Sequence, residues 1–186
     1  MKKNIFAVIV ALLIPMAALS CVGKSLVVGT DSSPKSKVVA QVLAILINER
    51  TGTTVQIIDH ETPEALFKEM RDGDVDIALQ YAGSALKRDG KNVGSDAAAT
   101  YELAKQHYQS AWNLAWLPPL GFTEEGDADS LAAPVAQKHA LKKFPALPRL
   151  IAKTEGTLTG ATVKELAGAD SIPRAVREFL KSNKLI

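Results

Sequence analysis

One stretch decides the fold: Arg71-Asp72-Gly73-Asp74-Val75-Asp76-Ile77-Ala78-Leu79-Gln80-Tyr81-Ala82-Gly83-Ser84-Ala85-Leu86. It predicts the end of a helix, a tight turn at Gly73, a short buried strand and a polar loop that opens the next helix. In an open α/β sheet, small ligands bind in the crevice beyond the carboxyl ends of the strands. Tyr81, Gly83 and Ser84 fall at that position, so we expect them to face a ligand.

Two strands and two helices precede this stretch. The β-branched run 25–29 predicts the first strand, and apolar residues at helical spacing predict a helix over 36–50, capped by Ser33. Residues 54–58 predict the second strand, and Thr62-Pro63 starts the second helix. Alternating strands and helices predict a parallel sheet with right-handed crossovers.

The rest of the chain predicts a fourth strand and mostly helices. A helix is expected over 96–111 and a strand over 113–117, which Pro118-Pro119 ends. Residues 126–130 indicate a linker or turn, residues 131–134 a short extended segment, and residues 135–144 a helix. Small helices fill the last 40 residues or so, the final one over 171–181. The predicted fold class is α/β.

The N-terminus is typical of an exported protein. Lys2 and Lys3 precede an apolar run and a small-residue stretch, which predicts a signal peptide over residues 1–20 and a single domain over residues 21–186. The segment ending at Cys21 resembles a bacterial lipobox, in which the cysteine is lipidated. The alternative is ordinary cleavage after Ser20, which leaves Cys21 as a free thiol.

Several function classes find little support in the composition. Residues 1–20 hold two lysines and no acidic residue, so without them the formal charge of +2 falls to zero, which does not favour a nucleic-acid partner. The three histidines are scattered, no nucleophile–base arrangement is visible, and Cys21 is the only cysteine, so we expect neither an enzyme nor a metal site nor a cofactor. Asp72, Asp74 and Asp76 are interpreted as a solvated strand entry rather than a calcium loop.

Polar loop residues gather at the predicted carboxyl ends of the strands. An aromatic ring among them can attract a quaternary ammonium ion. The alternative is a solvated rim without a ligand. The candidate ligand-binding residues are Thr30, Asp31, Ser32, Ser33, Gln80, Tyr81, Gly83 and Ser84, with Asp59 and His60 on the neighbouring loop.

Residues 73–84 also carry a family resemblance. They are similar to the Gly-x-Ile-Asp-x-x-x-x-Tyr-Thr-Gly-Thr motif of substrate-binding proteins of ABC importers for glycine betaine, choline and related osmoprotectants. Trp116-Leu117-Pro118-Pro119-Leu120-Gly121-Phe122 and Ala132-Ala133-Pro134-Val135 resemble later segments of that family, in family order. The resemblance implies a periplasmic-binding-protein-like lobe with a helical C-terminal segment.

The resemblance also implies that a second lobe is missing. Family members carry it between the two later segments, where this chain has only Thr123 to Ala132. We therefore expect a single lobe that binds a small quaternary amine weakly, or as a homodimer that rebuilds the cleft. The expected partners are an ABC permease subunit and, through a lipid on Cys21, the membrane at the periplasm or cell envelope. The alternative is a non-transport envelope lipoprotein that uses the lobe as a protein-interaction module.

Overall fold

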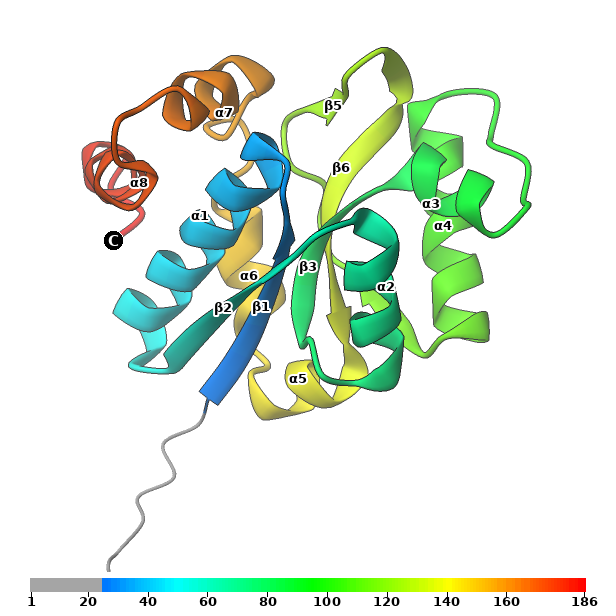
Figure 1. Cartoon of the computed structure of the whole chain (residues 1–186), viewed down its shortest axis with the longest axis horizontal. Coiled ribbons are helices and arrows are strands. Elements are labelled where there is room, and N and C mark those ends of the chain that lie inside the picture. Colours follow the sequence, from blue (N-terminus) through cyan, green and yellow to red (C-terminus); the bar gives the residue numbers. More distant parts are fainter. Residues whose placement is uncertain (1–24) are drawn as a thin grey trace, which may run out of the picture.

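The computed structural model describes residues 25–186, which form one α/β lobe (Figure 1). In chain order the elements are β1 (Ser25–Asp31), α1 (Pro34–Thr51), β2 (Thr54–His60), α2 (Pro63–Asp72), β3 (Ile77–Tyr81), α3 (Ala82–Arg88), α4 (Ala97–Ala111), β4 (Leu114–Trp116), β5 (Thr123–Glu124), β6 (Asp127–Gln137), α5 (Lys138–Lys143), α6 (Leu147–Ala152), α7 (Gly160–Ala167) and α8 (Ile172–Ser182). The predicted signal peptide and Cys21 lie outside the described residues.

The sheet has the strand order β2-β1-β3-β6-β4, and β5 pairs with β6. β1 is parallel to both β2 and β3, whereas β6 is antiparallel to both β3 and β4. β2, β1, β3 and β4 therefore point the same way, which confirms the predicted, mainly parallel sheet. β6 is the exception, and it brings its first residues to the edge where β1, β2 and β3 end.

The sequence signals at the helix ends act as predicted. Ser33 caps α1 by accepting a hydrogen bond from the Ser36 amide at 3.2 Å, and Pro34 is the first helical residue. Thr62 caps α2 in the same way. Gly52 and Gly73 end these two helices with φ angles of 68° and 93°, a left-handed conformation that favours glycine. One boundary differs, because α3 starts directly at Ala82 and no polar loop separates it from β3.

Each face of the sheet is covered by its own group of helices (Figure 1). α1, α6, α7 and α8 enclose one apolar core, and α2, α3 and α4 enclose the other. Trp116 is buried in the second core and Trp112 packs against it. The helical C-terminal segment is confirmed, and α8 returns onto α1, where Arg50 Nε donates to the carbonyl oxygen of Leu185 at 2.7 Å.

The prediction for residues 126–144 was only partly right, since Gly126 lies in a turn and residues 131–134 are extended, but the strand is much longer than expected and the helix is shorter. Residues expected to form a turn, a short extended segment and the start of a helix form the eleven-residue strand β6, and the helix α5 begins only at Lys138. β6 lies between β3 and β4, and its residues from Ala132 to Gln137 are buried. Tertiary pairing with two neighbours overrides the weak strand propensity of its alanines and of Pro134.

Within residues 25–186, no helix is long and apolar enough to cross a membrane.

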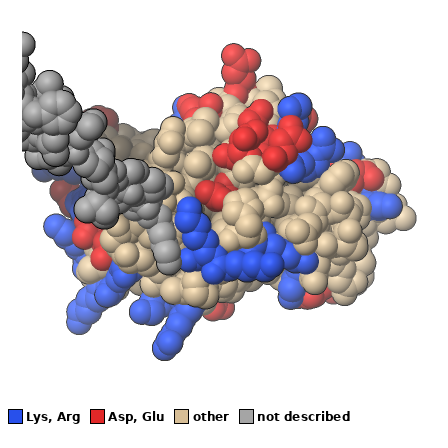
Figure 2. Space-filling view, turned by 90° about the horizontal axis from the view of Figure 1, so that it is seen from below, with Lys and Arg blue, Asp and Glu red and all other residues tan. Residues whose placement is uncertain are grey.

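Figure 2 shows the end of the molecule opposite the carboxyl ends of β1, β2 and β3, where a band of Lys and Arg side chains lies beside a group of Asp and Glu side chains. Both signs of charge therefore occur on this face.

Candidate functional site

The carboxyl ends of β1, β2 and β3 meet at one edge of the sheet, beside the β5–β6 hairpin. Parallel pairing aligns Asp31 with His60, and antiparallel pairing aligns Tyr81 with Ala132. The ends of these three strands, which carry the predicted rim residues, therefore lie side by side at this edge. The hairpin forms a further wall that the sequence did not predict.

Tyr81 is the centre of this edge. Its ring is half-buried and packs edge-to-face on Phe122, with 6.4 Å between ring centroids and an interplanar angle of 73°. Burial raises the pKa of the Tyr81 hydroxyl above its ordinary value, and the nearby negative charges of Glu124, Asp31 and Glu125 raise it further. The phenol is neutral at physiological pH, and it stands in a region of negative potential.

Two hollows flank Tyr81, and both are also lined by Ser33 and Glu124. The smaller has a volume of about 380 Å³, and the larger has a volume of about 630 Å³. The other residues of the smaller hollow are Asp31, Pro63, Glu64, Leu79, Gln80, Ser84 and Arg88. The larger is completed by Pro34, Lys35, Thr123, Glu125, Gly160, Lys164 and Ala167.

Glu124 joins the hairpin to the start of α3. Ser84 Oγ lies 2.7 Å from each carboxylate oxygen of Glu124, and Ser130 Oγ donates to Oε2 at 2.8 Å. The Gly83 amide in turn donates to Ser130 Oγ at 2.9 Å. Glu124 was not predicted from the sequence, because its partner Ser84 is 40 residues away and no local pattern marks the contact.

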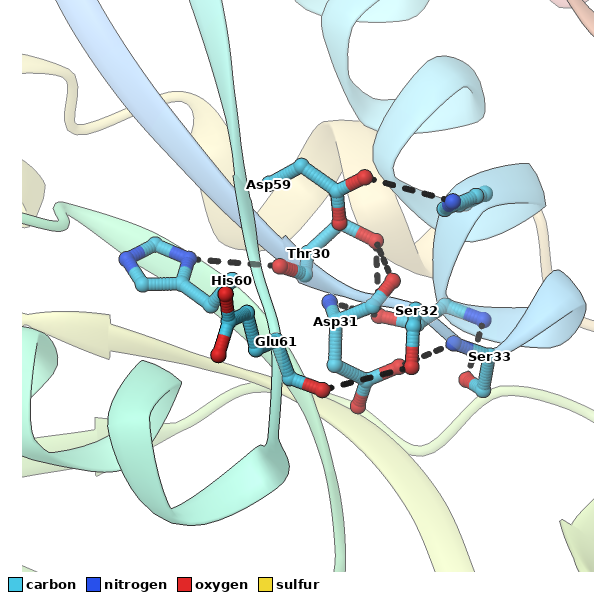
Figure 3. A network of polar contacts seen from close by, with 9 residues as sticks. Thr30, Asp31, Ser32, Ser33, Asp59, His60 and Glu61 are labelled. Atoms are coloured by element: carbon cyan, nitrogen blue, oxygen red, sulfur yellow. Dashed lines mark hydrogen bonds and ion pairs between the residues drawn. The ribbon is translucent and has the colours of Figure 1, made fainter.

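The loop after β1 is held by its own hydrogen bonds (Figure 3). Asp31 Oδ1 accepts from the Ser33 amide at 2.8 Å, and Ser32 Oγ donates to the carbonyl oxygen of Glu61. Thr30 is buried, its hydroxyl lies 2.9 Å from Ser36 Oγ, and its carbonyl oxygen lies 3.2 Å from His60 Nδ1. These contacts fix the β1 and β2 loops against each other.

Gln80 is buried behind Tyr81 and is held by Arg88. Arg88 Nη2 donates to Gln80 Oε1 at 3.1 Å and also to the Tyr108 hydroxyl, and its guanidinium carbon lies 3.7 Å from the centroid of the Phe67 ring. This arrangement combines hydrogen bonds with a cation–π contact in a mostly buried setting. Arg88 also lines the smaller hollow.

The structure therefore divides the predicted site residues into two groups. Asp31, Ser33, Gln80, Tyr81 and Ser84 line the hollows beside Tyr81. The other three do not line these hollows. Thr30 lines a separate hollow with Lys37 and Asp59, Ser32 lies on the exposed loop, and Gly83 lies beneath the hairpin, where its amide donates to Ser130 Oγ. Within residues 25–186, no group of three or more His, Cys, Asp or Glu side chains is placed to hold a metal ion.

The comparison with known families shows what kind of domain this is. Residues 24–185 match the model of the substrate binding domain of the ABC-type glycine betaine transport system. The chain belongs to this family. It is therefore the substrate-binding domain of an ABC transport system, and such domains act outside the cytoplasm. The family is a class of solute-binding proteins rather than of enzymes. The described residues of this chain form a single lobe.

Solved structures share the fold of this substrate-binding domain. A glycine betaine/carnitine/choline ABC transporter structure superposes with a TM-score of 0.78 at 13% identity, covering 88% of this chain and 99% of that chain. Apo YehZ from Escherichia coli superposes with a TM-score of 0.76 at 11% identity, covering 87% of this chain and 99% of that one. No curated protein matches the sequence.

Proposed function

We propose that this domain binds a small quaternary amine, such as choline or glycine betaine, in the hollows beside Tyr81, as the solute-binding lipoprotein of an ABC importer. The observation that carries the proposal is the half-buried Tyr81 ring with Asp31, Glu124 and Glu125 around it. An aromatic face and nearby carboxylates both attract an organic cation.

The site has a single tyrosine on one lobe, and this sets the expected strength of binding. Tight sites bury most of the ligand surface, and quaternary amines are usually held by several aromatic rings. Within residues 25–186, the aromatic ring that packs against Tyr81 is that of Phe122, which is only 6% exposed. We therefore expect millimolar affinity for the monomer, or a homodimer in which a second copy completes the cleft.

Calorimetric titration with choline, glycine betaine and carnitine tests this function. The purified protein should bind at least one of them, Tyr81→Phe should keep most of the affinity, and Tyr81→Ala should abolish binding. Sedimentation with and without ligand reports whether a dimer forms. An absence of binding in the wild type at millimolar ligand would reject the proposal.

Lipid anchoring and the permease contact are tested in cells. Cys21→Ala should move the protein from the membrane fraction to the soluble envelope fraction if Cys21 carries a lipid. Cross-linking from positions near Tyr81 should capture the permease subunit. Capture of an envelope protein unrelated to transport would instead support the alternative, an interaction module. The open Tyr81 edge of the single lobe favours that alternative.

A further inference from the structure

Glu124 occupies a fixed position beside Tyr81. Ser130 is fully buried and its Oγ accepts from the Gly83 amide, so its single hydroxyl proton is directed at Glu124 Oε2. The Ser84 hydroxyl is directed at the same carboxylate. Hydrogen bonds from two hydroxyl groups hold the Glu124 carboxylate in place, so Glu124 is a positioned acceptor beside Tyr81.

The same carboxylate faces the space where a ligand would lie. Glu124 and Tyr81 together line both hollows, and Glu124 is the charge that acts most strongly on the Tyr81 hydroxyl. A cationic head group against the Tyr81 ring would therefore meet a counter-charge that the chain itself provides.

The carboxylates beside Tyr81 disfavour a ligand that carries a carboxylate of its own. It would be repelled by Glu124 and Asp31, and the hydroxyl protons of Ser84 and Ser130 are already donated to Glu124. The cations nearby offer little compensation. Arg88 is hydrogen-bonded to Gln80, Lys35 is paired with Glu125 at 3.4 Å, and Lys164 is a solvent-exposed side chain of the larger hollow.

We infer that Glu124 is a specificity-determining residue that makes the Tyr81 site prefer cations without a carboxylate, of the choline type, over zwitterions of the betaine type. Because Glu124 lines both hollows, a betaine carboxylate bound in either one would lie near this like charge. The inference rests on the proposed function, since it concerns the same site. It also specifies the charges that the preferred ligand carries.

The test is the ratio of choline affinity to glycine betaine affinity, measured by calorimetry on the wild type and on Glu124→Gln. The glutamine keeps the size of the side chain and removes its charge. The wild type should prefer choline, and Glu124→Gln should lower the ratio by about tenfold, which corresponds to 1.4 kcal/mol. The matched control is Glu102→Gln on α4, a 53% exposed side chain that lines neither hollow and should leave the ratio unchanged.

A second variant guards against misfolding at Glu124. Ser84 is exposed, so Ser84→Ala should fold normally while it loosens the Glu124 carboxylate, and the ratio should fall in the same direction by a smaller amount. A wild type that prefers betaine, or a ratio unaltered in folded Glu124→Gln, would overturn the inference and leave the proposed function standing. A wild type that binds neither ligand would overturn both.

Discussion

The amide of Gly83 donates a hydrogen bond to Ser130 Oγ at 2.9 Å, which joins the first turn of α3 to strand β6 across 47 residues of sequence. A Cβ atom at position 83 would lie 2.9 Å from that oxygen and 3.0 Å from the Ser130 Cβ. The hairpin can approach the Tyr81 edge because residue 83 has no side chain. Gly83 is therefore needed for the close packing that brings its amide to Ser130 Oγ.

Replacing Gly83 by alanine should destabilise the fold by about 1–3 kcal/mol, because the added methyl group overpacks a buried contact. Urea unfolding measures this change. Gly160→Ala is the matched control, since its Cβ would meet only the Phe122 Cβ at 3.4 Å, and it should alter the free energy of unfolding by less than about 0.5 kcal/mol. Equal losses in the two variants would show that the hairpin is free to move away.

Replacing Arg88 by lysine should cost about 1–3 kcal/mol in the free energy of unfolding. Lysine cannot stack flat over Phe67 and also donate to both Gln80 and Tyr108, as the guanidinium does. Thermal and urea unfolding give the value. The control is Arg174→Lys on α8, an 82% exposed side chain that should tolerate the change. A neutral Arg88→Lys variant would mean that charge alone suffices at this position.

Asp76 should contribute to stability, although its sequence context indicated only a solvated strand entry. Its Oδ2 accepts from the Val27 amide at 2.8 Å and its Oδ1 lies 2.8 Å from His139 Nε2, which ties β1 and α5 to the start of β3. Asp76→Ala leaves the partly buried amide without this acceptor and should cost about 1–3 kcal/mol. Asp74→Ala, at an exposed position two residues earlier, should be close to neutral in the same denaturant titration.

The stability of the domain should fall at alkaline pH. Burial raises the pKa of the Tyr101 hydroxyl to about 12, above an unfolded value near 10. Between these values the unfolded chain has released the proton that the folded chain keeps, so the free energy of unfolding falls by up to about 1.4 kcal/mol per pH unit for this group. Tyr101→Phe should reduce the slope measured between pH 10 and 12, and an unchanged slope would contradict the assignment.

The sequence predicted the first half of the fold closely, because its signals are local. Ser33, Thr62, Gly52 and Gly73 each set a helix boundary through contacts within a few residues. The full length of β6 was not predicted, because its conformation depends on β3 and β4 rather than on Pro134 and the alanines it contains.

The candidate site shows the same division. The placement of Tyr81 at a strand end followed from the strand–helix alternation, and the structure confirms that position. Glu124 could not be found in this way, since its role arises from Ser84 and Ser130, which reach it only in the folded lobe. Thr30 is polar and Gly83 is small, as expected of residues beside a ligand. Both instead form hydrogen bonds within the protein, Thr30 with Ser36 and Gly83 with Ser130.

The turn between β5 and β6 is a position at which the chain can accept inserted residues. Gly126 has a φ angle of 80°, and a Cβ atom there would contact nothing within 4 Å, so the turn is open to solvent while both strands stay paired. Surface turns of this kind accept inserted domains, and each doubling of loop length costs only about 0.6 kcal/mol. A folded module could therefore be spliced into this turn, directly beside the Tyr81 edge, while the sheet and both cores are preserved.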